Sequence, residues 1–101
     1  MEDQYFPTVV QALAGDNYTV YAYFTDGTIH LYDMKPLLKK GGVFARLEDK
    51  DFFTNNLTVM NSTIAWDLSG SFDPSMCIDI DPFDVYQSEK TDDPLAEKLD
   101  A

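Results

Sequence analysis

The stretch Tyr18–Asp33 reads YTVYAYFTDGTIHLYD and contains two runs of β-branched and aromatic residues on either side of Asp26-Gly27. An Asp-Gly pair between such runs is typical of a β-hairpin with a two-residue type I′ turn, which requires positive φ at both central residues. Thr25 then lies opposite Thr28, and the hairpin has one aliphatic and one aromatic face. The expected aliphatic pairs are Phe24–Ile29 and Ala22–Leu31, with Val20 at the end of that face, and the expected aromatic pairs are Tyr23–His30 and Tyr21–Tyr32.

The aromatic face of this hairpin is the candidate interaction surface, formed by Tyr21, Tyr23, His30 and Tyr32. One interpretation is a binding patch for a peptide, a base or a partner protein. The other, which we favour, is that short helices cover these residues or that they are ordinary cross-strand pairs, a normal means of stabilising a sheet. His30 is the only histidine, and no acid or nucleophile adjacent in the sequence marks it as a catalytic base.

The remaining sequence predicts an α+β fold, with an antiparallel sheet built from a three-strand meander and a second hairpin, packed by short helices. A strand over residues 8–14 completes the meander, and apolar residues on both of its faces place it inside the sheet. The second hairpin pairs Leu57–Met60 with Thr63–Asp67 around Asn61-Ser62, a weaker turn signal than Asp-Gly. Its apolar face carries Trp66, which we expect in the core.

Short helical segments are expected to begin near Asp33, Asp49 and Asp81. An aspartate before a helix accepts hydrogen bonds from the free N–H groups of the first turn. Pro36 and Pro82 follow two of these residues and fit a first helical turn, where the missing N–H of proline is not needed.

The length of 101 residues and a hydrophobic content of 45% fit one domain with one core. We expect an N-terminal arm over residues 1–7, a single α+β domain over 8–86 and an acidic, mobile tail over 87–101. No apolar run reaches the roughly 18 residues of a membrane span. The acidic N-terminus lacks the features of a signal peptide, and the single cysteine fits a reducing compartment. These observations predict a cytoplasmic protein without a membrane partner.

The formal net charge is −11, from 7 basic and 18 acidic residues. Such a charge argues against direct nucleic-acid binding, which requires a basic footprint. Residues 35–50 form the one basic segment of the chain. An acidic protein is steered toward a basic protein partner, although charge of this kind also serves solubility alone. A homo-oligomer, formed through an uncovered aromatic face or an unpaired edge strand, remains open.

Other polar residues do not form a recognisable catalytic, cofactor or metal motif. The run of Asp79, Asp81 and Asp84 resembles a metal site, but a calcium loop beginning at Asp79 requires glycine and glutamate where Asp84 and Lys90 stand. Helix capping explains Asp81 and Asp84 better. Cys77 fits a small apolar filler near a strand, because nothing nearby in the sequence lowers its pKa. We therefore expect no catalytic residue, no metal and no cofactor.

Several short patterns in a fixed order resemble the domain of unknown function 2442 family, over about residues 7–86. The F-x-D-G turn at Phe24–Gly27 is followed by a short Asp-led helix around Asp33, Pro36 and Leu37. The pattern Phe-x-x-Leu-x-Asp then occurs at Phe44, Leu47 and Asp49. Apolar-x-Trp follows at Ile64–Trp66, and apolar-Tyr at Val85-Tyr86.

The resemblance implies a small bacterial α+β fold and no established biochemical activity. It also implies gene pairs that look like toxin–antitoxin modules, and it supplies no catalytic residues. The leading hypothesis is a non-enzymatic, antitoxin-like interaction module that binds a small basic protein. The alternative hypothesis is a small-ligand binder or enzyme that uses the aromatic and His30 face of the first hairpin.

Overall fold

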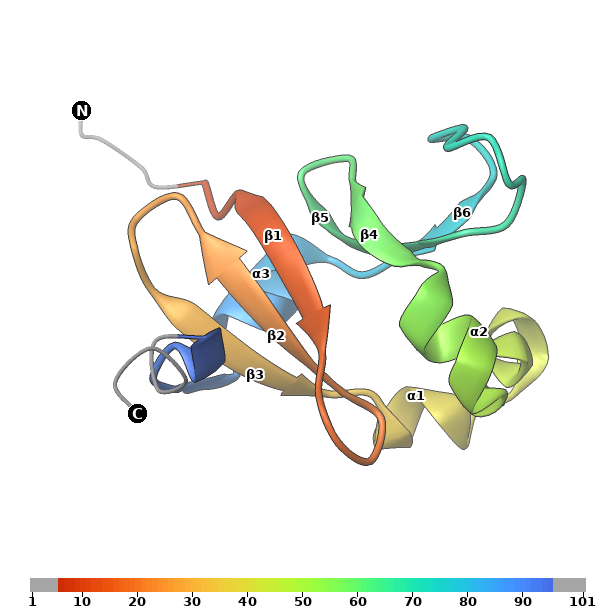
Figure 1. Ribbon diagram of the computed structural model, residues 1–101, viewed down its shortest axis with the longest axis horizontal. Helices are drawn as coiled ribbons and strands as arrows, with labels where there is room; N and C mark the ends of the chain where they lie inside the picture. Colours follow the sequence, from red (N-terminus) through yellow and green to blue (C-terminus); the bar gives the residue numbers. More distant parts are fainter. Residues whose placement is uncertain (1–5, 96–101) are drawn as a thin grey trace.

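Two antiparallel sheets form the framework of residues 6–95, which are the residues described by the computed structural model (Figure 1). The first sheet has the strand order β1-β2-β3-β7 and the second the order β4-β5-β6. The predicted α+β class is confirmed, with the meander and the second hairpin in separate sheets. The strands are β1 (Val9–Ala14), β2 (Thr19–Phe24), β3 (Ile29–Asp33), β4 (Leu57–Met60), β5 (Thr63–Asp67), β6 (Cys77–Asp79) and β7 (Glu89–Lys90).

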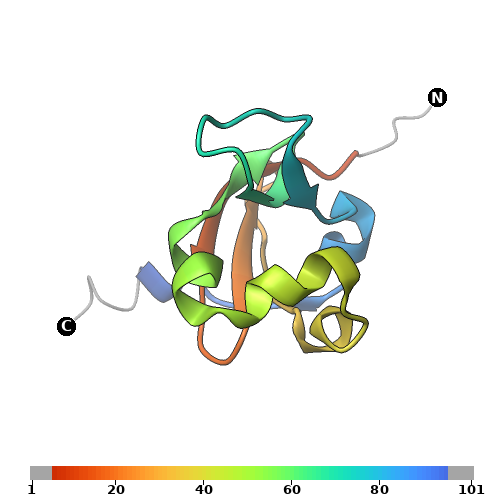
Figure 2. The same cartoon turned by 90° about the vertical axis from the view of Figure 1, so that its right-hand side faces the viewer.

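Short helices fill the space beside the sheets (Figures 1 and 2). The helical segments are α1 (Lys35–Leu38), the 3₁₀ helix η1 (Gly42–Glu48), α2 (Lys50–Asn55) and α3 (Pro82–Tyr86). The predicted caps are present at two of them. Asp49 accepts hydrogen bonds from the first turn of α2, and Asp81 accepts one from the N–H of Phe83 in α3. At α1, Asp33 Oδ1 accepts from the N–H of Lys35 at 2.9 Å.

The register of the first hairpin differs by one residue from the prediction. Val20 lies opposite Tyr32, and Ala22 opposite His30. The N–H of Phe24 donates to the Thr28 carbonyl at 2.9 Å, so the loop contains three residues rather than two. Because side chains alternate along a strand, this slip exchanges the two faces of β3. His30 and Tyr32 consequently face the interior of the molecule.

The turn chemistry of Asp26 explains the correction. Its Oδ1 accepts from the Thr28 N–H at 2.9 Å and from the Thr28 hydroxyl at 2.6 Å. Gly27 has a φ of 88°, while Asp26 is not among the residues with positive φ. A type I′ turn needs positive φ at both positions, whereas a three-residue loop needs one residue in the left-handed region. The Asp-Gly signal thus predicted the hairpin correctly and its turn type wrongly.

The second hairpin has the predicted register. Leu57 pairs with Trp66, Val59 with Ile64, and Met60 with Thr63. Asn61 and Ser62 have φ values of 56° and 65°, as the type I′ turn requires.

Strand β1 lies at the end of its sheet rather than inside it, which corrects the prediction. It is nevertheless not a free edge, because the N–H of Val9 donates to the carbonyl of Ser62 at 2.9 Å and β1 packs beside β4. A bulge between Val9 and Gln11 shifts its pairing with β2. The two sheets therefore meet along β1 and share one core.

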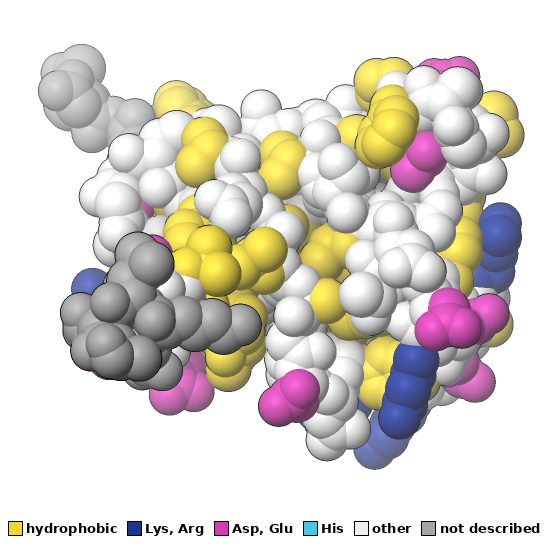
Figure 3. Space-filling model, viewed as in Figure 1, with side chains coloured by type: hydrophobic (Ala, Val, Ile, Leu, Met, Phe, Trp, Pro, Cys, Tyr) yellow, Lys and Arg dark blue, Asp and Glu magenta, His cyan; other side chains and the backbone are white. Residues whose placement is uncertain are grey.

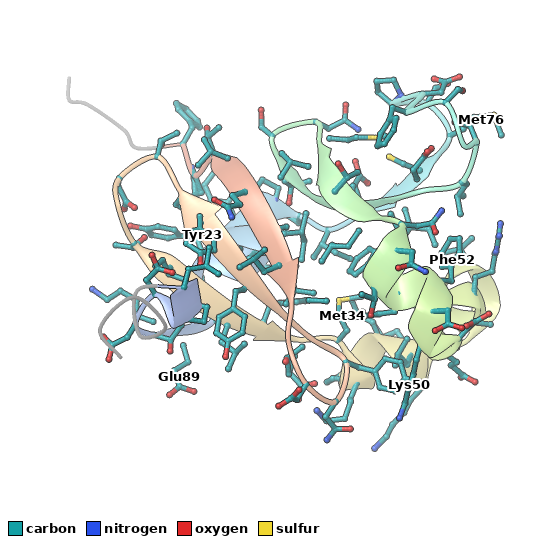
Figure 4. All side chains as sticks on the ribbon, in the orientation of Figure 1. Tyr23, Met34, Lys50, Phe52, Met76 and Glu89 are labelled. Carbon is teal, nitrogen blue, oxygen red and sulfur yellow. The ribbon has the colours of Figure 1, made fainter. Side chains whose placement is uncertain are left out.

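The core lies between the sheets and the helices. Trp66 is fully buried, as predicted, and its Nε1–H donates to the carbonyl of Phe53 at 2.9 Å. The rings of Phe53 and Trp66 are 5.2 Å apart, and Tyr18 packs edge-on against Phe53 at 5.3 Å. Met34, also fully buried, fills the space between β3 and α2 (Figure 4). Trp66 thereby joins the second sheet to α2.

The C-terminal boundary of the domain lies beyond the expected position at residue 86. Lys90 pairs with His30 and Glu89 with Leu31, so that β7 extends the first sheet. The N–H of Thr91 adds a bond of 2.8 Å to the carbonyl of Ile29. Residues 87–91 therefore belong to the domain. The parts of the expected arm and tail at residues 1–5 and 96–101 lie outside the described residues.

Replacing Trp66 with phenylalanine is expected to lower the free energy of unfolding by about 2–3 kcal/mol. The change leaves a cavity and removes the donor to the Phe53 carbonyl. Urea unfolding followed by far-ultraviolet circular dichroism measures the effect without relying on the lost tryptophan fluorescence. A loss below about 0.5 kcal/mol, the usual size for surface changes, would contradict this role.

Candidate functional site

The four residues of the predicted interaction surface do not share a face. Tyr21 and Tyr23 lie on the outer face of the first sheet, whereas His30 and Tyr32 lie on the inner face, as a consequence of the observed register. The structure thus separates the surface that the sequence predicted into two pairs.

His30 is held inside the domain by contacts on every side. Its exposed fraction is 3%. Nδ1 lies 3.0 Å from the Ser88 carbonyl, and Nε2 lies 3.1 Å from the Thr28 hydroxyl. The ring packs against Phe24 and Tyr86, with centroid distances of 5.2 and 4.7 Å. These contacts join β3, the first hairpin turn and α3. His30 therefore has a structural role in the fold.

Asp26 links the same turn to α3. Besides binding Thr28, its carboxylate accepts from the Tyr86 hydroxyl at 2.6 Å through Oδ2. The hydrogen bonds from Thr28 and then Tyr86 lower the pKa of Asp26 from 3.8 to about 2. The ionised carboxylate therefore stabilises the turn throughout the neutral range.

The outer pair is partly covered by the C-terminal segment. The hydroxyl of Tyr23, labelled in Figure 4, donates to Asp93 Oδ1 at 2.6 Å. Burial, followed by this carboxylate, raises the pKa of Tyr23 to about 12. Tyr21 lines a hollow of about 310 Å³ together with Leu13 and Leu95. Asp93 and Leu95 therefore lie over the part of the outer face that Tyr21 and Tyr23 form.

The inner tyrosine, Tyr32, is half-buried near α3. Burial raises the pKa of its hydroxyl, and the charges of Asp84, Asp33 and Asp81 raise it further. Tyr32 is therefore a neutral phenol at neutral pH.

The polar residues near β6 bind one another or cap helices. Asp79 Oδ2 accepts from the side chain of Asn61 at 3.1 Å, and Asp81 caps α3. Burial, followed by the charges of Asp79, Asp67 and Asp73, raises the pKa of the Cys77 thiol. Cys77 is therefore a thiol rather than a thiolate at neutral pH. Within residues 6–95, no cluster of three or more potential ligands has the arrangement of a metal site.

The basic segment, residues 35–50, forms the surface over α1, η1 and α2, where Lys and Arg side chains gather in Figure 3. An open hollow of about 410 Å³ lies there, lined in part by Tyr18, Leu38 and Lys39. Lys35 is engaged with Asp33 at 3.0 Å and with the Asn17 carbonyl at 3.0 Å. This surface is cationic, and His30 does not line its hollow.

Sequence reasoning missed the organisation of the loop over residues 68–76. Asp67 is a buried carboxylate at its start, and it accepts from the N–H groups of Ser69 and Phe72 at 3.0 and 3.2 Å. Burial opposes the charge of Asp67, but the bonds from Ser69, Phe72 and Gly70 outweigh it and lower its pKa. The pattern Asp-x-Ser, which occurs at 67–69 and again at 73–75, was the available signal.

The same loop presents apolar side chains to solvent. Phe72 is 64% exposed and Met76 is 51% exposed. Phe72 also has a φ of 58°, a conformation uncommon for a bulky residue. Figure 3 shows hydrophobic and acidic side chains side by side at this corner of the molecule, and Figure 4 labels Met76 at its rim.

These features define a small α+β domain with a buried histidine and an outer sheet face that the C-terminal segment partly covers. Its cationic surface over α1, η1 and α2 is separate from the exposed loop over residues 68–76, which carries apolar and acidic side chains. A family model described as "Protein of unknown function (DUF2442)" matches residues 9–91, and the chain belongs to this family. The resemblance inferred from the F-x-D-G turn and the later patterns is thereby confirmed. A search of curated proteins and a search of solved structures each gave no significant match.

Replacing Asp26 with asparagine is expected to lower the free energy of unfolding by about 1 kcal/mol at neutral pH, since solvent screens this exposed turn. The folded-state pKa lies below the ordinary value, so the stabilisation is present above 3.8 and is lost as the pH falls toward about 2. Urea midpoints of both proteins, measured across this range, should converge at the acid end. A difference that is independent of pH would contradict the role of the charge.

Replacing His30 with alanine is expected to lower the free energy of unfolding by about 2–4 kcal/mol, because it removes a buried ring and leaves the Ser88 carbonyl without this contact. The matched control is Gln11→Ala on the exposed outer face of the same sheet, with a change within about 0.5 kcal/mol. Chemical denaturation measures both. Equal stability of the two variants would mean that His30 is not structural.

Proposed function

We propose that this domain is a non-enzymatic interaction module that binds a small basic partner protein, with an antitoxin-like role as its most specific form. The observation that carries the proposal is the separation of charge along the chain. No Lys or Arg occurs from residue 51 to residue 89. The acidic residues of this part are Asp51, Asp67, Asp73, Asp79, Asp81, Asp84 and Glu89.

A basic partner would meet the acidic side chains of residues 51–89 with complementary potential, which raises association rates and disfavours acidic proteins. The net charge of −11 points the same way and disfavours direct contact with nucleic acid. The proposal places the module in the cytoplasm, which suits the single, half-buried cysteine. Among residues 6–95, no helix has the length and apolar character of a membrane span.

The alternative function, a small-ligand binder or enzyme, depended on Tyr21, Tyr23, His30 and Tyr32 sharing one face. The observed register places these residues on two faces. His30, the residue best suited to acid–base chemistry, has both ring nitrogens within 3.1 Å of internal partners. We therefore base the proposed function on charge and not on the aromatic residues.

A pull-down with the tagged chain from its native host, analysed by mass spectrometry, is expected to recover a stoichiometric protein of basic isoelectric point. The recovery should fall as salt rises from about 50 to about 300 mM, because screening weakens attraction between exposed charges. A gel shift with host DNA at physiological salt should show no complex. Recovery of no stoichiometric partner, or of an acidic one, would contradict the proposal.

A further inference from the structure

The loop between β5 and β6 carries the apolar–acidic corner, which we define as Phe72, Pro74 and Met76 with the carboxylates of Asp73 and Asp79. We propose that this corner is the docking surface for a basic segment of the partner protein that also carries apolar side chains. The inference rests on the proposed function and assigns it a place on the molecule.

The exposed apolar residues are the first support for the assignment. Phe72, Pro74 and Met76 stand at alternate positions of one loop, and all three are exposed. Isolated exposed apolar residues are normal on a protein surface, but large ones that gather on one element mark interaction sites. Aromatic residues and methionine are also the types enriched at protein interfaces.

The loop is already folded in the free domain, which lowers the entropy cost of binding. Asp67 fixes the Phe72 N–H, and the Ser69 hydroxyl accepts from the N–H groups of Ser71 and Asp73 at 3.0 and 3.3 Å. At the far end, Asn61 donates to the Pro74 carbonyl at 3.3 Å and to Asp79 at 3.1 Å. Phe72 and Met76 therefore extend from a loop that is fixed at both ends.

Charge identifies the occupant as basic. Asn61 contacts both the loop and Asp79, so this carboxylate lies beside the exposed apolar residues. The ion pair found between described residues, Lys35–Asp33, belongs to a different element. In Figure 2 the loop lies at the upper edge of the molecule, whereas α1, which Lys35 begins, lies near the lower edge. Asp79 Oδ2 accepts from Asn61, and Asp73 Oδ1 accepts from the N–H and hydroxyl of Ser75, but neither carboxylate forms an ion pair with a described Lys or Arg. Because a carboxylate can accept several hydrogen bonds, both can still bind a partner's Lys or Arg.

The test uses the full chain labelled with ¹⁵N and two short probe peptides, one alternating lysine with leucine and the other alternating lysine with serine. The lysine–leucine peptide should bind saturably and shift the amide signals of residues 68–79. The lysine–serine peptide should bind at least about tenfold more weakly, because it lacks the apolar contacts.

The decisive variant is Phe72→Ser, and its matched control is Phe6→Ser. The side chain of Phe6 is 65% exposed, close to the 64% of Phe72, but it lies against Phe83 and outside the corner. Phe72→Ser should lower the affinity for the lysine–leucine peptide by about tenfold or more, and Phe6→Ser should leave this affinity unchanged. Because Phe72 is on the surface, the amide spectrum should keep its native dispersion. Asp79→Asn should reduce the salt dependence of the affinity.

Four outcomes would overturn the assignment. Binding of the peptide with shifts elsewhere, or equal affinity of Phe72→Ser and the native chain, would refute this corner while leaving the proposed function intact. Concentration-dependent shifts of residues 35–50 and 68–79 without peptide would make the occupant a second copy of the chain. Failure of both peptides to bind, together with recovery of a basic partner from the host, would show that the partner docks by other chemistry.

Discussion

The pair of hydrogen bonds from Thr28 to the carboxylate of Asp26 is the constraint on which the first sheet depends. These bonds, at 2.9 and 2.6 Å, fix a three-residue loop and thereby the register of β2 against β3. The register decides that His30 rather than Ile29 faces the interior, and it sets where β7 pairs. The other oxygen of Asp26 binds Tyr86, which brings α3 onto the same turn. The carboxylate of Asp26 thus connects the hairpin turn, the first sheet and α3.

The comparison of the two hairpins shows which parts of a fold are local. At Asn61-Ser62 both central residues have positive φ and the predicted register is correct, although the sequence signal is weak. At Asp26-Gly27 the signal is strong, yet only Gly27 has positive φ. The local bonds between Asp26 and Thr28 favour the three-residue loop, and the distant partners Tyr86 and Ser88 stabilise the same register further. Local propensity identified both turns, but the register of the first hairpin depends on the bonds of the Asp26 side chain and on these tertiary contacts.

The same distinction separates the predictable parts of the remaining fold from the others. Asp49 and Asp81 act on N–H groups within three residues, so these caps were visible in the sequence. The bulge in β1 and the pairing of β7 depend on strands far along the chain, and no local pattern indicates them. Trp66 was placed correctly in the core, because a large apolar ring on the apolar face of a strand is strongly favoured to be buried.

The candidate interaction surface depended even more strongly on long-range contacts than the fold did. The aromatic face was assembled from the predicted register alone, so the one-residue slip removed it. The apolar–acidic corner could not be derived beforehand, because the loop conformation follows from the burial of Asp67 at the end of β5. Its Asp-x-Ser patterns indicate turns, but they do not show that Phe72 remains exposed. The exposure of a side chain depends on the packing of the whole fold, so a local sequence pattern cannot predict it.

The separation of the two charged corners has a consequence for how a basic partner would approach. In Figure 2 the loop over residues 68–76 lies at the upper edge of the molecule, α1 lies near the lower edge, and η1 and α2 lie between them. On the proposed function, a basic protein would be repelled by the cationic surface over α1, η1 and α2 and attracted by the loop, and both effects would act over about 8–10 Å at physiological salt. Such a partner would be oriented before any side chain made contact. Charge would then select the direction of approach, and Phe72 and Met76 would supply the short-range contacts of the proposed complex.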